Sequence, residues 1–430
     1  MNKADRNKKS RREFIKSGTL AAAGALAGFS IVRNAYGQNA DPIRVGLIGC
    51  GGRGTGAAEN CLNAAPNVKL VALADLYQDN LDKCRKNLTD PNREDGQLKG
   101  IEIDDDHCFV GFDSFKKLLA TDVNLVILAT PPGFRPEHFE AVVAAGKHVF
   151  CEKPVAVDPV GIRRFMKAGE LSVQKGLAVV AGTQRRHDPA YQETIKRLQE
   201  GQIGDIVSTR VFWNGGGLWK YERKPGWSDM EWQTRNWYYF DWLCGDHIVE
   251  QHLHNLDVIN WAMDAHPVKA LGVGGRQVRT DPVYGNIWDH FAIDYEYENG
   301  LHMISMCRHW ENCDRLIGEF FAGSAGTCEI VNDRYIIRGQ KSWRYRGGKV
   351  NPYVQEHKDL IDSIRSGKPL NESRKVAEAT MTAIMGRQSA YTGKEITWDE
   401  MMASELDYSP PKYEFGPLPV RPVPMPGQTS

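Results

Sequence analysis

The sequence predicts a two-domain α/β protein: a parallel sheet with helices on both faces, followed by an α/β domain with an open, largely antiparallel sheet. Three observations favour this fold class. Short apolar strands alternate with helical segments over residues 41–180, which is typical of a parallel sheet. Longer runs of alternating polarity, separated by turns, follow between residues 181 and 400. A chain of 430 residues, 41% of them apolar, is also long enough to form two domains.

The first predicted domain opens with a strand, a helix and a second strand. Residues 43–48 and 68–74 are apolar runs of strand length, and residues 52–62 between them are expected to form a helix. Strands connected through helices in this way pair in parallel, and the helices cover both faces of the sheet. The alternation continues with a strand at 125–129, a helix at 136–145 and a strand at 148–151.

The second predicted domain contains two hairpins. Residues 291–297 and 301–307 alternate in polarity on either side of Asn299-Gly300, a dipeptide that tolerates the positive φ of a tight turn. A second turn at 323–326 separates two more strands. The remaining elements are helices at 354–366 and 375–391 and a proline-rich end at 409–430, which is expected to form an extended strap or a loose tail.

The first 37 residues resemble a twin-arginine export signal. Arg11 and Arg12 are followed by an Ala- and Gly-rich apolar run at 18–32 and then by Ala35-Tyr36-Gly37. The run, about 15 residues long, is too short and too weakly apolar to span a bilayer about 30 Å thick. A basic tail without an export role is the alternative. We exclude residues 1–37 from the fold and expect a periplasmic or otherwise exported protein that engages the twin-arginine export machinery.

The charge of the chain disfavours several classes of partner. Residues 1–37 carry eight basic and two acidic side chains, which leaves 46 basic and 52 acidic side chains in the rest. Binding to nucleic acid or to an anionic membrane needs clustered Lys and Arg on the folded body. We therefore expect no nucleic-acid partner and no stable membrane insertion, and a small neutral molecule as the substrate.

The nine cysteines are scattered singly along the chain. An odd number without a repeated short spacing predicts neither a disulfide framework nor a CxxC metal pair.

A glycine motif predicts where a dinucleotide binds. Gly49, Gly51 and Gly54 form G-x-G-x-x-G between a predicted strand and a predicted helix, and Asp75 ends the second strand. This context is typical of a Rossmann fold, in which the glycines let the pyrophosphate approach the helix start. Asp75 can accept hydrogen bonds from the adenosine ribose, which favours NAD, whereas Arg53 in the turn could receive the 2′-phosphate of NADP. A turn that serves packing alone is the alternative.

The residues after this motif resemble one known family. Ala129-Thr130-Pro131, His138, the run 145–149 and Glu152-Lys153-Pro154 occur in this order. The set resembles the glucose-fructose oxidoreductase / inositol dehydrogenase (Gfo/Idh/MocA) family over most of residues 43–400, and Glu-Lys-Pro is its most specific part. The resemblance implies a Rossmann domain followed by a substrate-binding domain at 181–400, whose open sheet often mediates oligomerisation, and hence a homo-oligomer. It also implies Lys153 as the catalytic lysine and a cofactor site that includes Thr130, Pro131, His138 and Glu152.

The family's second signature is an Asp followed four residues later by a His, which is itself followed by x-x-Asp. His254 and Asp257 match its latter half, but position 250 holds Glu in place of Asp. Glu250 and His254 are four residues apart, so on a helix they project from one face.

These residues suit the oxidation of a secondary alcohol. The hydroxyl proton must leave as the hydride departs, and an imidazole such as His254 suits the role of base. Lys153 would lie beside the nicotinamide, where its ammonium can hydrogen-bond the reacting oxygen or join a proton relay. Glu250 is expected to orient His254.

Two further patterns leave alternatives open. His247, Glu250 and His254 lie along one predicted helical face with His252 nearby, and this spacing is compatible with a metal site, although hydride transfer needs no ion and we predict none. Trp213, Trp219, Trp227, Trp232, Trp237 and Trp242 crowd into one segment. Such a segment fits either a loop that stacks on sugar rings or an oligomer interface.

Together these features predict an exported NAD(P)-dependent oxidoreductase that acts on a sugar, cyclitol or glycoside. Export of the folded protein would favour an NAD that stays tightly bound, because the periplasm offers little free NAD. The first alternative is a redox-neutral NAD-dependent glycosidase. The second is a non-catalytic NAD-binding or sugar-sensing protein, because a fold alone does not fix a function.

Overall fold

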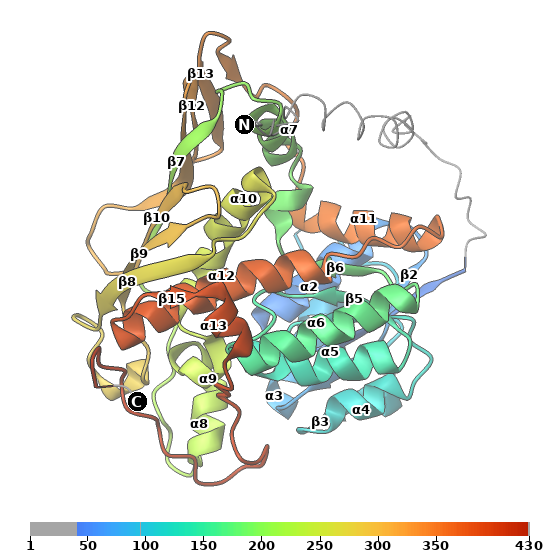
Figure 1. Cartoon of the computed structure of the whole chain (residues 1–430). Helices are drawn as coiled ribbons and strands as arrows, with labels where there is room; N and C mark the ends of the chain where they lie inside the picture. The colour runs from blue at the N-terminus through green and yellow to red at the C-terminus, as the bar shows by residue number, and fades with distance from the viewer. Residues whose placement is uncertain (1–40, 95, 429–430) are drawn as a thin grey trace, which may run out of the picture. The chain divides into compact units, whose positions relative to one another are not determined.

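The predicted strands of the first domain form one parallel sheet. The computed structural model describes residues 41–94 and 96–428. Six strands pair in the order β3-β2-β1-β4-β5-β6, all in parallel (Figure 1). The order reverses between β1 and β4, and ligands bind at the carboxyl ends of strands beside such a reversal. The strands are β1 (Ile43–Ile48), β2 (Val68–Asp75), β3 (Cys108–Val110), β4 (Leu125–Leu128), β5 (His148–Cys151) and β6 (Val179–Ala181).

Helices cover both faces of this sheet, as predicted. Alternate side chains of β4 enter two different apolar cores, so each face is buried under its own group of helices. One face packs against α2 (Gly52–Ala64), α3 (Gln78–Thr89) and α11 (Pro352–Arg365), and the other against α4 (Ser114–Leu119), α5 (Arg135–Ala144) and α6 (Pro159–Gln174).

One helix of the parallel sheet comes from late in the chain. Leu360 and Ile361 of α11 are fully buried in the core that α2 and α3 also form. The backbone of Val179 in β6 bonds with Leu370 and Glu372, which extends the edge of the sheet. A segment inside the range 181–400 therefore completes the first domain.

The second sheet is open and largely antiparallel, as predicted. Nine strands pair in the order β14-β13-β12-β11-β7-β10-β9-β8-β15, and only β7 and β10 run parallel. Both predicted hairpins form, β9 with β10 and β11 with β12. The strands are β7 (Ile206–Gly215), β8 (Lys269–Gly275), β9 (His290–Glu296), β10 (His302–His309), β11 (Leu316–Gly323), β12 (Gly326–Val331), β13 (Arg334–Gly339), β14 (Trp343–Arg344) and β15 (Ile396–Thr397).

The two faces of the second sheet differ. Helices α10 (Leu253–Met263) and α12 (Ser373–Thr392) lie against one face, where Phe291, Ile293 and Met303 are buried (Figure 1). Other apolar side chains of the same sheet are exposed to solvent, with exposed fractions of 41% to 68%. They are Val207 of β7, Leu271 and Val273 of β8, and Met306 of β10. The remaining helices are α7 (Pro189–Gln199), α8 (Asp229–Arg235), α9 (Asp241–Cys244) and α13 (Trp398–Ala403).

The described part of the proline-rich end, residues 409–428, forms an extended strap; we call it the C-terminal strap. It has neither helix nor strand and runs beside α8 (Figure 1). The Leu418 amide donates to Asp229 Oδ2 at 3.0 Å, and Arg421 forms an ion pair of 2.6 Å with Asp241. The strap is therefore bound along its length.

Three further predictions concern the export signal, membrane insertion and the cysteines. The expected twin-arginine signal, residues 1–37, lies outside the described residues. Across residues 41–94 and 96–428, no helix is long and apolar enough to cross a membrane. All nine cysteines are free within this part of the chain, in agreement with the prediction of no disulfide framework.

Candidate active site

The glycine motif forms a tight turn between β1 and α2. Gly49 has a φ of 99°, and a Cβ added to it would lie 2.7 Å from the Ala129 carbonyl carbon and the Thr130 nitrogen. A Cβ at Gly54 would lie 1.8 Å from the Gly49 oxygen, whereas one at Gly51 would meet nothing within 4 Å. Two of the glycines are thus required by the backbone, and the third leaves open space at the start of α2. A helix start with open space before it fits a pyrophosphate.

Asp75 lies beside this turn, at the carboxyl end of β2. Its carboxylate accepts hydrogen bonds from the amides of Cys50 and Tyr77 at 2.7 and 2.8 Å and from the Asn80 side chain at 3.2 Å. Burial raises the pKa of Asp75, and the two backbone hydrogen bonds oppose that shift. The side chain is fixed where an adenosine ribose is expected to bind.

A cavity of about 120 Å³ opens between the turn and Asp75. Thr130, Pro131 and His138 line it, as expected for cofactor-binding residues. Burial, with a smaller contribution from the Arg135 cation, lowers the pKa of His138 to about 3, so its ring is neutral. Ligand pockets usually measure about 300–1,000 Å³, so this cavity accounts for one end of a dinucleotide. The sequence reasoning did not assign several further lining residues to the cofactor site, among them Tyr77, Phe112, Phe134, Thr234 and Trp237.

Arg53 and Glu152 lie outside the lining of this cavity. The Arg53 guanidinium bonds to Glu152 Oε1 at 2.6 Å and to Glu356 Oε1 of α11 at 3.4 Å, and it stacks over the Tyr353 ring at 5.1 Å. Glu152 and Glu356 are almost fully buried, and a buried carboxylate needs a paired cation. Arg53 is therefore held away from Asp75, so it lends no support to a 2′-phosphate site.

Lys153 and Glu250 meet across the two domains. Lys153 follows β5, and its Nζ lies 3.1 Å from Glu250 Oε1 and also donates to the Glu250 carbonyl oxygen. Both side chains are nearly buried, with exposed fractions of 11% and 13%. Glu250 belongs to a π-helical turn, Ile248–His252, and such turns are frequent at functional sites.

His254 stands at the start of α10, and its ring stacks on Trp213 of β7 at 5.9 Å. Burial lowers the pKa of His254 well below its usual value, and the positive charges of Lys153, Arg185 and Arg53 lower it further. The imidazole is therefore neutral. We expected Glu250 to orient this ring, but its carboxylate bonds to Lys153, because the ammonium is the nearer charged donor.

Asp257, the last residue of the second signature, forms an ion pair with Arg186. Arg186 donates three hydrogen bonds to Asp257, at 2.8, 2.9 and 3.2 Å. Both residues are nearly buried. Asp257 thus fastens α10 to the segment after β6.

His247 and His252, which lie near His254 in the sequence, contact different residues. His247 Nδ1 lies 2.9 Å from Asp246 Oδ1, and His252 Nε2 lies 2.8 Å from Ser305 Oγ. Within the described residues, no group of three or more His, Cys, Asp or Glu side chains is placed to hold a metal ion.

The tryptophan-rich segment is divided among several environments. Trp213 stacks on His254, and Trp237 lines the cavity between the glycine turn and Asp75, which we call the nucleotide cavity after its predicted ligand. Trp232 and Trp242 are buried in an apolar cluster, whereas 42% of Trp219 is exposed. One tryptophan therefore lies at the predicted catalytic residues and another at the predicted cofactor site.

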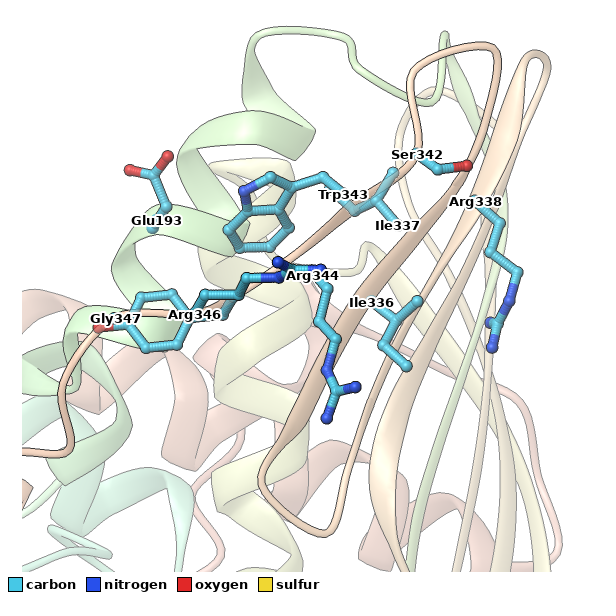
Figure 2. A pocket seen from close by; sticks show the side chains of 10 residues that line it. Glu193, Ile336, Ile337, Arg338, Ser342, Trp343, Arg344, Arg346 and Gly347 are labelled. Carbon is cyan, nitrogen blue, oxygen red and sulfur yellow. The ribbon is translucent and has the colours of Figure 1, made fainter.

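A wider cavity of about 890 Å³ lies at the far edge of the second sheet, around β13 and β14 (Figure 2). Trp343, Arg344 and Arg346 line it, and none of the predicted site residues does. The wider of the two cavities is therefore not the one beside the predicted cofactor residues.

Comparison with known proteins agrees with this geometry. Residues 43–181 match the model of the GFO_IDH_MocA family, described as an oxidoreductase family with an NAD-binding Rossmann fold. The inositol 2-dehydrogenase of Gluconacetobacter diazotrophicus is 25% identical over 386 residues, which are 85% of this chain and 99% of the relative. The 2,7-anhydro-N-acetylneuraminate hydratase of Escherichia coli is 28% identical over 179 residues, 41% of this chain, and the match spans only 44% of the relative's length.

A solved structure shows the same fold over most of the chain. The aldose-aldose oxidoreductase of Caulobacter crescentus complexed with glycerol superposes with a TM-score of 0.65 at 17% identity, covering 83% of this chain and 99% of the other. Residues 43–181 are thus an NAD-binding Rossmann domain of the Gfo/Idh/MocA oxidoreductase family, and the likeness to the inositol 2-dehydrogenase extends over 85% of the chain.

Proposed function

We propose that the protein is an NAD-dependent oxidoreductase that removes a hydride from a secondary hydroxyl carbon of a sugar, cyclitol or glycoside. One observation carries the proposal: Lys153 bonds to Glu250, and its charge, together with that of Arg53 just after the glycine turn, acts on the buried His254 ring. The relatives named inositol 2-dehydrogenase and aldose-aldose oxidoreductase support this substrate class.

Lys153, Glu250 and His254 have separate roles in the proposed reaction. The His254 ring, which burial and the neighbouring cations keep neutral, accepts the hydroxyl proton, although its lowered pKa makes it a weaker base than a free imidazole. The Lys153 ammonium hydrogen-bonds the same oxygen and stabilises its developing charge. Glu250 holds Lys153 in place through its carboxylate. NAD, when bound at the glycine turn, supplies the hydride acceptor.

The site favours NAD over NADP. Asp75 is fixed at the expected ribose position and would repel a 2′-phosphate. Arg53, the one residue that argued for NADP, is occupied by Glu152 and Glu356.

We propose further that the protein is exported with NAD already bound and keeps it through turnover. The sequence of residues 1–37 supports export, and the small cavity, closed in by aromatic side chains, supports retention. Cofactor that is lost on dialysis, together with activity that needs added NAD, would contradict retention.

A homo-oligomer fits the second sheet. Val207, Leu271 and Val273 are more than half exposed, and exposed apolar side chains on an open sheet are typical of an interface. Light scattering of the purified protein would give its mass, and a single 48.2 kDa species would argue against assembly.

A second candidate is the redox-neutral glycosidase, in which NAD oxidises the sugar transiently and is restored. The E. coli relative is named a hydratase, an enzyme of water addition, and this favours chemistry without net oxidation.

The deciding experiment adds free sugars, cyclitols and aryl glycosides to the NAD-loaded protein while NADH absorbance and aryl alcohol are recorded. Lys153→Ala is the matched control. NADH formed by the wild type alone supports the dehydrogenase, and aryl alcohol without net NADH supports the glycosidase. Bound NAD without either signal, across all substrates, would favour a sensing role.

A further inference from the structure

We propose that the C-terminal strap forms the outer wall of the nucleotide cavity, with Phe415 and Tyr413 as positioning residues that slow release of the dinucleotide. The proposal rests on the proposed binding of NAD, but it does not depend on which sugar is oxidised.

The strap touches the aromatic walls of the cavity from behind. The Phe415 ring lies 5.1 Å from the Phe112 ring and 5.8 Å from the Tyr77 ring. The Tyr413 ring lies 5.3 Å from the Phe134 ring. Phe112, Tyr77 and Phe134 all line the cavity. The strap therefore joins three walls that come from three different loops of the first domain.

The second domain closes the same cavity from the other side. Thr234 and Trp237 line it, and the Tyr77 hydroxyl lies 2.5 Å from Thr234 Oγ1. The Arg235 guanidinium stacks over the Tyr77 ring at 3.7 Å and bonds to Asp79 at 3.0 Å. Tyr77 is thus fixed between a helix of the second domain and the strap.

Contacts on both sides of Phe415 hold the strap in place. Before it, the Tyr408 amide donates to Asp158 Oδ2 at 2.9 Å. After it, the Gln233 side chain donates to the Leu418 carbonyl at 2.5 Å, and Trp288 Nε1 donates to the Pro424 carbonyl at 3.0 Å. A segment anchored at these points resists the movement that would let the walls separate.

The exposure of Phe415 supports a covering role. Almost half of its side chain, 48%, faces solvent. The ring contacts both Tyr77 and Phe112, so it links these two walls from the solvent side and must move if they are to part.

The experiment measures the release of NADH from the full-length protein, without any sugar. NADH fluorescence is followed after the loaded protein is mixed with excess NAD, for the wild type and for Phe415→Ala, Phe415→Tyr and Val420→Ala. Val420 is the matched control, because it lies in the same strap and is 41% exposed. Thermal melting checks that each variant is folded.

We expect Phe415→Ala to release NADH about tenfold faster, which corresponds to about 1.4 kcal/mol and fits the loss of two aromatic contacts. Phe415→Tyr, which keeps the ring, and Val420→Ala should stay within about twofold of the wild type. Equal release rates for Phe415→Ala and the wild type would overturn the proposal. A wild type that binds no NADH at all would instead refute the proposed function.

Discussion

His254 and His187 are both almost fully buried, with exposed fractions of 8% and 3%, yet they differ in charge. Burial alone would lower the pKa of His187, but its bonds to Asp359 and Glu372 raise it to about 10. His254 has no hydrogen-bond partner among the described residues and faces three cations, so its pKa falls well below the usual value. The charge of a buried histidine is thus set by its partners: one ring is a structural cation, and the other is neutral.

Replacing His254 should have the largest effect, and on activity alone. We expect His254→Ala to lower kcat about 10³-fold, since a general base contributes about 10²–10⁴. Its melting temperature should change little, because the ring takes part in no bonded network. Steady-state kinetics with a substrate found in the screen, together with calorimetry, would measure both. A loss of less than tenfold would mean that another group accepts the proton.

Replacing His187 should have the opposite effect. His187→Ala leaves Glu372 buried without its cation, and breaking a buried ion pair costs about 3–5 kcal/mol. We expect the free energy of unfolding in urea to fall by about 3 kcal/mol while kcat per folded molecule stays within about threefold. Retained stability with lost activity would reverse the assignment of the two rings.

The pH dependence sharpens the contrast further. The folded pKa of His187, about 10, lies above its ordinary value of 6.5. Its stabilisation is therefore complete below about pH 6.5 and is lost as the pH rises towards 10. The stability difference between the wild type and His187→Ala should shrink over that range. The pKa of His254 is shifted in the opposite direction, so activity should show no loss from this group as the pH falls through 6.5, the ordinary pKa of a histidine.

The smallest effect is expected at the cofactor site. Asp75→Ser removes the charge that repels a 2′-phosphate, and we expect the preference for NAD over NADP to fall about tenfold, or about 1.4 kcal/mol. Binding titrations with both dinucleotides would measure the ratio. An unchanged ratio would indicate that another group discriminates between them.

Short-range patterns predicted most of the fold. The glycine turn, the strand before it, the helix after it and the Asn299-Gly300 hairpin depend on neighbours in sequence, and they form where expected. The glycines and Asp75 could be predicted as cofactor-binding residues because the motif, the strands and the turn that place them are all local in sequence.

Contacts between distant residues could not be predicted in this way. Lys153 and Glu250 are 97 residues apart, and Arg53 and Glu356 are 303 apart. Sequence spacing suggested that Glu250 serves His254, but the fold brings a stronger partner, the Lys153 ammonium, to the carboxylate. The aromatic walls of the cavity were missed because Phe112 and Trp237 carry no motif and meet only in the folded chain.

The contribution of α11 to the parallel sheet bears on how the protein is made. Leu360 and Ile361 close one face of a sheet whose first strand begins at Ile43. A ribosome must therefore complete more than three quarters of the chain before that face can be covered. Any fragment that stops before Pro352 would leave the part of this face that α11 covers exposed to water. Most strands of the second sheet lie in the sequence between the first strands of the Rossmann domain and α11, which completes that domain. The two domains of this protein are therefore not two consecutive segments of the chain.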